Sequence, residues 1–227
     1  LPVETDLIIA VGSGTIDDLC RYVAYERRIS FISVPTAASV DGFVSTVAAM
    51  TWDGMKKTMP AAAPIYVFAD TNIFKAAPYR LTASGVSDLL GKYIALADWK
   101  IAHLVTGEYI CGEIIELEYE ALKEVVSCID DLPRKDGQAY EKLMYALLLS
   151  GLAMQMTGNS RPASCAEHPM SHLWEMEVIN EPIDALHGEK VSVGMILVRD
   201  RYAAVAEAIR KGNCRVHPYE GLEKELI

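Results

Sequence analysis

The first 80 residues alternate short apolar runs with one amphipathic segment, which is the pattern of an α/β sheet. Residues 6–14, DLIIAVGSG, predict a buried strand that ends in a glycine turn, and residues 15–28 predict the helix that follows. Residues 29–39, ISFISVPTAAS, predict a second strand. A third strand is expected at Ile65–Ala69, after a hairpin-like excursion around Asp53-Gly54. Strand–helix–strand order at this spacing favours a parallel sheet.

From Pro78 onward the apolar positions follow a helical period almost throughout. The chain therefore divides into an α/β part, residues 1–79, and an all-α domain, residues 80–227. The first part is expected to hold a portion of a parallel nucleotide-binding sheet. A sheet domain that abuts a helical domain forms a cleft, which is the usual place for a ligand. The helical segments are residues 82–105, 113–132, 138–158, 161–176 and 185–211.

Composition narrows the classes of function. The 227 residues are 51% hydrophobic and 23% charged, which is ordinary for a globular protein with a substantial core. The net charge of −10, without a block of lysine or arginine, argues against nucleic acid and anionic membranes as partners. The longest apolar runs are too short to span a bilayer, so no membrane insertion is expected. Five dispersed cysteines predict free thiols in a reducing compartment, and a cytoplasmic protein is expected.

The start of the chain is unusual for a complete domain. A fully apolar strand follows only a few residues after Leu1, and a strand of this kind requires neighbours on both sides. We therefore expect that the chain begins partway through a domain. Further chain, or association into a homo-oligomer, would complete the sheet.

A glycine turn joins the first predicted strand to its helix at Ala10–Asp18, AVGSGTIDD. Small residues let backbone amides approach a phosphate, and the helix N-terminus adds partial positive charge. The turn lacks the full dinucleotide-binding fingerprint, and a purely structural β–α turn is the alternative. Asp17 and Asp18 fit that alternative equally well, because acidic residues stabilise the start of a helix.

A loop of small hydroxylated residues, Ser33–Ser45, includes the end of the second predicted strand. At the carboxyl end of a parallel strand, this loop would face the same crevice as the glycine turn. Asp41 is a candidate for binding a polyol hydroxyl. The alternative is a plain Asp41-Gly42 turn.

Asp88 and three histidines are candidates for a metal site. Asp88 lies within an apolar helix, where it either forms a solvated ion pair with Lys92 or is buried and needs a partner such as a metal. His168, His172 and His187 occur close together in the sequence, with the first two one helical turn apart. An Asp, His and His set with an open position fits a catalytic metal. The alternative is a set of structural histidines.

These pieces occur together, in this order, in one family. The sequence resembles the sn-glycerol-1-phosphate dehydrogenases, a branch of the iron-containing alcohol dehydrogenase and glycerol dehydrogenase superfamily. The combination SVPTAASxDG and SRPASxAEHxxSH points to the glycerol-phosphate branch. The matching stretches are GSGTIDD, ISVPTAASVDGFVS, SGVSDLLGKYIALADW, SRPASCAEHPMSH and LHGEKVSVG, which together cover nearly the whole chain.

The resemblance implies a dehydroquinate synthase-like fold with a divalent metal between the two domains and NAD or NADP as cofactor. Zinc is the expected metal, with iron, nickel or manganese as alternatives. Asp88, His168 and His187 match the family's metal ligands. Asp41, Asp88 and His172 match substrate-contacting positions, and Asp41 and His172 are the catalytic candidates. The cofactor site is matched by Gly12, Ser13, Gly14, Thr15, Asp17, Thr36, Ala37, Ala38, Ser39 and Ser45.

The implied activity is the interconversion of dihydroxyacetone phosphate and sn-glycerol 1-phosphate, so the expected partner is a small phosphorylated polyol. Arg161, Lys190 and Lys92 are candidates for binding its phosphate. A glycerol dehydrogenase or a cyclase of the dehydroquinate synthase type is the alternative on the same scaffold. A truncated, non-catalytic remnant is a further alternative, because the resemblance implies more chain at both ends.

Three positions depart from the family pattern. Ser13 replaces a common glycine, and Val40 stands where a histidine is frequent. Pro169 directly follows a ligand position, so it must lie in a first helical turn or bend the helix.

Overall fold

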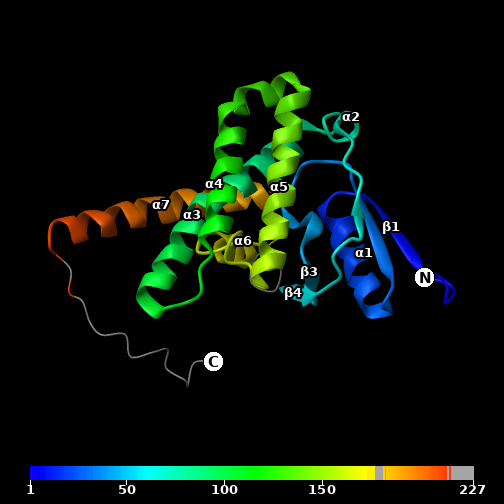
Figure 1. Ribbon diagram of the computed structural model, residues 1–227, viewed down its shortest axis with the longest axis horizontal. Coiled ribbons are helices and arrows are strands. Elements are labelled where there is room, and N and C mark those ends of the chain that lie inside the picture. Colours follow the sequence, from blue (N-terminus) through cyan, green and yellow to red (C-terminus); the bar gives the residue numbers. More distant parts are fainter. Residues whose placement is uncertain (177–180, 182, 214, 216–227) are drawn as a thin grey trace.

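The computed structural model describes residues 1–176, 181, 183–213 and 215. An α/β part is followed by a helical part, as predicted (Figure 1). The first part contains β1 (Leu7–Gly12), α1 (Gly14–Arg27), β2 (Ser30–Pro35), a 3₁₀ turn η1 (Gly42–Val44), β3 (Val47–Trp52), β4 (Met55–Pro60), β5 (Tyr66–Val67) and α2 (Thr71–Phe74). The second contains α3 (Tyr79–Thr106), α4 (Gly112–Ser127), a 3₁₀ segment η2 (Ile129–Arg134), α5 (Gly137–Thr157), α6 (Glu167–Trp174) and α7 (His187–Arg210).

Three parallel strands form a sheet in the order β1-β2-β5, which confirms the predicted parallel sheet. β1 pairs with β2 along its whole length. β5 is shorter than predicted, because only Tyr66 and Val67 pair with β2. The amides of the flanking residues Ile65 and Phe68 still donate to the carbonyl oxygens of Phe31 and Ser33, both at 2.9 Å.

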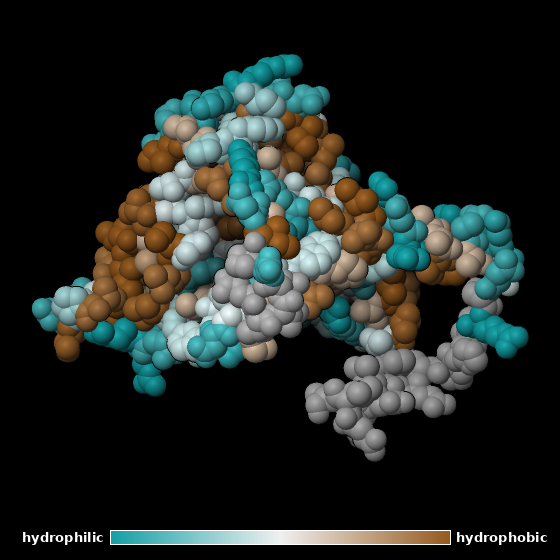
Figure 2. All heavy atoms as spheres, turned by 180° about the vertical axis from the view of Figure 1, so that it is seen from behind, coloured by the Kyte–Doolittle hydropathy of each residue, from teal (hydrophilic) through white to brown (hydrophobic). Residues whose placement is uncertain are grey.

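β1 is less buried than predicted. Ala10 is buried against α1, whereas Ile9 and Val11 on the opposite face are 57% and 61% exposed. A strand alternates its side chains between two faces, and the described residues cover only the α1 face of this one. The result is a broad apolar area on the sheet side of the molecule (Figure 2).

β3 and β4 form the predicted antiparallel hairpin, with Asp53-Gly54 at its turn. Both turn residues have positive φ angles, 51° and 73°, as a type I′ turn requires. Glycine takes this conformation freely, and aspartate is among the few other residues that tolerate it. The hairpin extends from the sheet part toward α6, and this placement matters for the site.

The main hydrophobic core lies among α3, α4 and α5. Trp99, Leu122 and Leu143 from these three helices are completely buried. α4 and α5 lie side by side in Figure 1, and α3 packs against α7. Because α3 carries Asp88 and α7 begins at His187, the packing that forms the core also brings two predicted site residues together.

Two expectations from composition can be compared with the structure. The described cysteines, Cys20, Cys111, Cys128 and Cys165, are all free thiols, as predicted; Cys214 lies outside the described residues. Among the residues that the structure describes, no helix combines the length and apolarity that crossing a membrane requires.

Candidate active site

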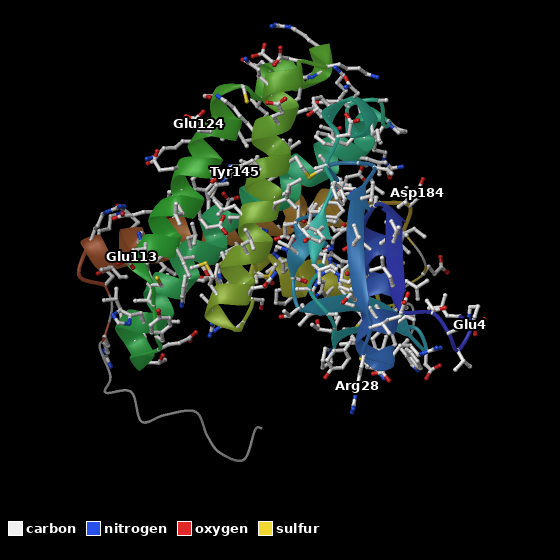
Figure 3. The ribbon with its side chains drawn as sticks, turned by 45° about the vertical axis from the view of Figure 1, so that its right-hand side comes forward. Glu4, Arg28, Glu113, Glu124, Tyr145 and Asp184 are labelled. Atoms are coloured by element: carbon white, nitrogen blue, oxygen red, sulfur yellow. The ribbon has the colours of Figure 1, made fainter. Side chains whose placement is uncertain are left out.

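A cleft of about 540 Å³ lies between the sheet part and the helical part. The two parts and the side chains packed between them are seen in Figure 3. Gly14 and Thr15 of the glycine turn, and Asp41 of the loop after β2, lie on one wall. The three histidines reach the cleft from the helical part. They are His168, His172 and His187.

Three helices bring the predicted metal ligands together. Asp88 is on α3, His168 is the second residue of α6, and His187 is the first residue of α7. One ligand atom from each residue can be chosen so that all three lie within 4.8 Å of one another. Asp88 is completely buried and His168 is 4% exposed, so the solvated-face alternative for Asp88 is wrong.

Two glycines permit this close approach. A Cβ atom at Gly188 would overlap the carbonyl oxygen of Ser84, and one at Gly85 would overlap the carbonyl oxygen of Ala38. The amide of Gly188 also donates a 3.1 Å hydrogen bond to Oγ of Ser84. The N-terminus of α7 therefore rests directly on α3, and α3 rests on the loop that follows β2.

A largely buried carboxylate contacts the Nδ1 atom of each of the two candidate metal-ligand histidines. Glu167 Oε1 lies 2.7 Å from Nδ1 of His168, and Glu175 Oε1 lies 2.9 Å from Nδ1 of His187. Such contacts place a proton on Nδ1 and turn Nε2 toward the shared site, where Nε2 of His168 lies 3.2 Å from Oδ1 of Asp88. This arrangement, with the carboxylate of Asp88 beside it, fits a divalent cation.

Asp88 and Lys92 form a buried charge cluster with Asp41. Lys92 Nζ lies 2.6 Å from Oδ2 of Asp41 and 3.6 Å from Oδ1 of Asp88. The Asp41 amide donates to Oδ2 of Asp88 at 3.1 Å, and Ser150 donates to Oδ2 of Asp41 at 3.0 Å. Burial disfavours the ionised form of Asp88, but Lys92 and the hydrogen bond from His168 outweigh it, so the pKa of Asp88 lies well below its usual range.

The pKa values of His168 and His172, which lie one helical turn apart, are shifted in opposite directions. Burial disfavours charge on both. Hydrogen bonds to Asp88 and Glu167 outweigh it at His168 and raise its pKa to about 9. At His172, burial and the neighbouring histidines lower the pKa to about 4, so this ring is neutral at pH 7. The ring centres of His172 and His187 lie 5.6 Å apart.

Glu118 on α4 is buried behind this cluster. It is completely buried, and neither carboxylate oxygen has a hydrogen-bond partner among the described residues. Burial raises the pKa of Glu118 to about 8, although the charge of Lys92 opposes the shift. Glu118 is therefore protonated in the folded protein at neutral pH.

Exchanging Glu118 for glutamine should flatten part of the pH dependence of stability. Between pH 4.5 and 8 the folded state holds a proton on Glu118 that the unfolded state has lost, so stability falls as pH rises through this range. The quantity of interest is the unfolding free energy of Glu118→Gln minus that of wild type. We expect this difference to be more positive at pH 8 than at pH 5, by on the order of 3 kcal/mol. Urea denaturation at both pH values measures this difference. The exposed Glu116→Gln is the matched control, and a parallel pH dependence of wild type and Glu118→Gln would contradict the prediction.

The glycine turn reaches the cleft at its helical end. Gly14 and Thr15 line the cleft, and Ser13 precedes α1 with its hydroxyl hydrogen-bonded to that of Ser39. Gly12 lies against Ile16, whose side chain occupies the place of a Cβ atom. Asp17 also borders the cleft, but its carboxylate accepts hydrogen bonds from Ser33 and Arg21 and is already satisfied.

The predicted cofactor residues of the loop after β2 lie mostly behind the lining of the cleft. Thr36 donates from its amide to the carbonyl of Gly12, which ties the loop to the glycine turn. Ser45 lines the cleft and accepts a hydrogen bond from Arg21 at 2.6 Å. The other predicted residues of this loop are buried: Ala37, Ala38 and Ser39.

The three candidate phosphate-binding cations differ in availability. Lys92 is completely buried in the charge cluster, and Arg161 is paired with Glu108 at 2.7 Å, so neither is available to a substrate phosphate without rearrangement. Lys190 lies 3.7 Å from Oε1 of Glu175, near the candidate ligand histidines.

Pro169 is the third residue of α6, within the first turn, as its missing amide requires.

Several residues of the site are not predicted by the sequence. Nothing in the sequence marks Glu167, Glu175 and Glu118 as buried, because a glutamate in a helical segment normally lies in solvent. Lys56 lines the cleft from the hairpin, and its role depends on a contact with a residue far away in sequence. The position of Glu167 directly before a candidate ligand histidine was the available signal.

Comparison with known proteins agrees with these observations. A family model described as iron-containing alcohol dehydrogenase matches residues 1–78. Glycerol-1-phosphate dehydrogenase of Bacillus licheniformis is 44% identical over 209 residues, which cover 92% of this chain and 52% of the relative. The enzyme of the same name from Methanosarcina barkeri is 36% identical over 232 residues, covering 100% of this chain and 64% of the relative. The chain is homologous to the glycerol-1-phosphate dehydrogenases.

The chain also shares its fold with solved structures. The glycerol dehydrogenase from Schizosaccharomyces pombe superposes with a TM-score of 0.73 and 24% identity, covering 89% of this chain and 52% of that structure. The fold is that of the iron-containing alcohol dehydrogenases and glycerol dehydrogenases, as predicted. The chain spans about half the length of the first curated relatives it matches.

Proposed function

We propose that the chain carries the metal and substrate site of an NAD(P)-linked dehydrogenase that interconverts dihydroxyacetone phosphate and sn-glycerol 1-phosphate. The convergence of Asp88, His168 and His187 at the cleft carries the proposal. The relatives named glycerol-1-phosphate dehydrogenase support the choice of substrate. We propose residues 1–79 and 80–227 as the two domains, and the free thiols support a cytoplasmic site of action.

Each residue has a proposed task. A divalent cation on Asp88, His168 and His187, with zinc favoured by the donor set, supplies Lewis-acid polarisation of the substrate carbonyl. Asp41, held by Lys92 and Ser150, accepts a hydrogen bond from a substrate hydroxyl. His172 is neutral at pH 7, so its ring is able to hydrogen-bond a substrate hydroxyl or to accept its proton.

The cofactor is proposed to lie along the sheet wall of the cleft. NAD or NADP supplies the hydride. Gly14 and Thr15 are the first two residues of α1 and line the cleft, where the helix N-terminus favours an anion such as the cofactor's pyrophosphate. Ser45 contributes from the loop after β2. The remaining proposed cofactor residues shape this wall from behind: Gly12, Ser13, Asp17, Thr36, Ala37, Ala38 and Ser39.

Metal content tests the proposed site first. We expect the purified chain, after incubation with zinc and removal of excess, to retain about one equivalent by elemental analysis, in line with a three-ligand site. Asp88→Ala and His168→Ala should each lose it. The exposed His103→Ala on α3 should retain it. A wild type that retains no zinc, or ligand variants that retain as much as wild type, would overturn the proposed site.

An assay of NAD(P)H oxidation separates the substrates. Dihydroxyacetone phosphate should be reduced in preference to dihydroxyacetone, and His168→Ala should abolish the reaction. A preference for the unphosphorylated compound would instead indicate a glycerol dehydrogenase. Turnover of a sugar phosphate without net consumption of NAD(P)H would indicate a cyclase of the dehydroquinate synthase type. Zinc binding without turnover of any of these compounds would favour a non-catalytic role for this chain.

A further inference from the structure

Lys56, Glu175 and His187 form a chain of contacts across the cleft. Lys56 belongs to β4, on the hairpin that extends from the sheet part. Its Nζ atom lies 2.9 Å from Oε2 of Glu175, and the other carboxylate oxygen lies 2.9 Å from Nδ1 of His187. The side chains of Lys56 and Glu175 are only 17% and 10% exposed. One carboxylate thus contacts a wall of the cleft with one oxygen and a candidate metal ligand with the other.

Several contacts hold the backbone and the carboxylate of Glu175 in place. It directly follows α6, and its amide donates to the carbonyl oxygens of Ser171 and His172, both at 3.1 Å. The hydroxyl of Ser171 donates to Oε1 at 3.3 Å, and Lys190 Nζ lies 3.7 Å from the same oxygen. Its carboxylate therefore has a fixed place between the hairpin and the ring of His187.

The hairpin contributes much of the opposite wall. Ala49, Met50 and Thr51 of β3, together with Lys56 and Thr58 of β4, line the cleft. A change in the distance between this hairpin and α6 would change the width of the space in which cofactor and substrate are proposed to meet. Among the hairpin residues that line the cleft, Lys56 forms an ion pair with the helical part.

We propose that Glu175 is a positioning residue that joins the β3–β4 hairpin to the metal ligand His187, so that metal binding and the position of the hairpin depend on each other. The inference rests on the proposed metal site. If His187 holds the metal, its ring would be fixed in place; the ring would then fix the carboxylate of Glu175 through Nδ1, and the carboxylate would retain Lys56. Such a coupling is reciprocal, so a hairpin held in place also favours metal binding.

Zinc affinity tests the first half of the inference. Zinc is titrated against a chromophoric chelator for wild type, Glu175→Gln and the exposed control Glu116→Gln. We expect Glu175→Gln to weaken zinc binding about 10- to 100-fold, the usual effect of losing a carboxylate that orients a ligand histidine. The control should bind as wild type does. Thermal unfolding of the metal-free proteins establishes that each variant is folded.

Hydrogen exchange of the hairpin tests the second half. We expect zinc to slow amide exchange over residues 47–60 in wild type and in Lys57→Met, which alters the exposed neighbouring lysine. In Lys56→Met this protection by zinc should disappear. If Glu175→Gln binds zinc as tightly as wild type, or if zinc protects the hairpin equally in Lys56→Met, the inference is overturned while the metal site stands. If wild type binds no zinc, the proposed function fails and the inference fails with it.

Discussion

Replacing Gly188 with alanine should destabilise the protein and remove zinc binding together. The new Cβ atom would overlap the carbonyl oxygen of Ser84, a backbone atom that cannot rotate away. In an open helix the same change would be favourable by up to about 1 kcal/mol, so the expected loss is steric. We expect the unfolding free energy to fall by about 3 kcal/mol or more, at the upper end of overpacking effects.

The loss of zinc follows from where Gly188 lies. It is adjacent to His187, and moving the start of α7 away from α3 moves that histidine away from Asp88. Functional sites tolerate displacements of only about 0.5 Å. Urea denaturation and zinc titration of the same samples measure both effects. A loss of stability with little change in zinc affinity would mean that the site does not depend on the contact between α3 and α7.

Gly137→Ala provides the matched control. Gly137 is also at the start of a helix, α5, and a Cβ atom there would meet nothing within 4 Å. We expect this variant to be as stable as wild type or slightly more stable, with unchanged zinc affinity, because alanine favours a helix. If both glycine variants lose stability equally, the effect belongs to the helix starts in general and not to the contact with Ser84.

The sequence is informative about the site wherever a local pattern carries the chemistry. The pair His168 and His172 and the glycine turn at Gly12–Thr15 are local features, and the structure brings both to one cleft. The parallel sheet and the Asp53-Gly54 hairpin follow from strand spacing and turn chemistry in the same way. Such features are predictable because few residues determine each of them.

What the sequence does not reveal depends on contacts between distant residues. Asp88 and Lys92 have the spacing of a solvated ion pair, and only the packing of α3 against its neighbours shows that both are buried. Ile9 and Val11 have the pattern of a buried strand, yet the described residues leave them exposed. Glu175 and Lys56 are more than a hundred positions apart, so their ion pair has no local signature. Long-range packing decides all three cases.

Lys92→Met should destabilise the metal-free protein strongly and make it more dependent on zinc. Burial opposes the charge of Lys92, but Asp41 and Asp88 raise its pKa above the ordinary value, so the ammonium is present throughout the working pH range. Methionine keeps the length of the side chain and removes this charge, which leaves two carboxylates without their common partner. Breaking a buried pair in this way costs about 3–5 kcal/mol.

Zinc should recover part of this loss. A divalent cation on Asp88 replaces the missing positive charge, so the variant loses less stability in the zinc-loaded state than in the metal-free state. By linkage, the variant must then bind zinc more tightly than wild type, and zinc should raise its melting temperature by a larger increment. Thermal unfolding with and without zinc measures both increments. Equal increments in the two proteins would show that Lys92 and the metal do not share the charge of Asp88.

Lys142→Met separates burial from charge alone. Lys142 also pairs with a carboxylate, Glu124, at 2.6 Å, but its side chain is 41% exposed. An exposed pair contributes only about 0–1 kcal/mol. This variant should therefore melt close to wild type and gain the same increment from zinc as wild type does. If it behaves like Lys92→Met, the change in net charge would explain both results. If only Lys92→Met responds, the charge of the buried lysine offsets, in the metal-free protein, part of the carboxylate charge that a bound cation would offset.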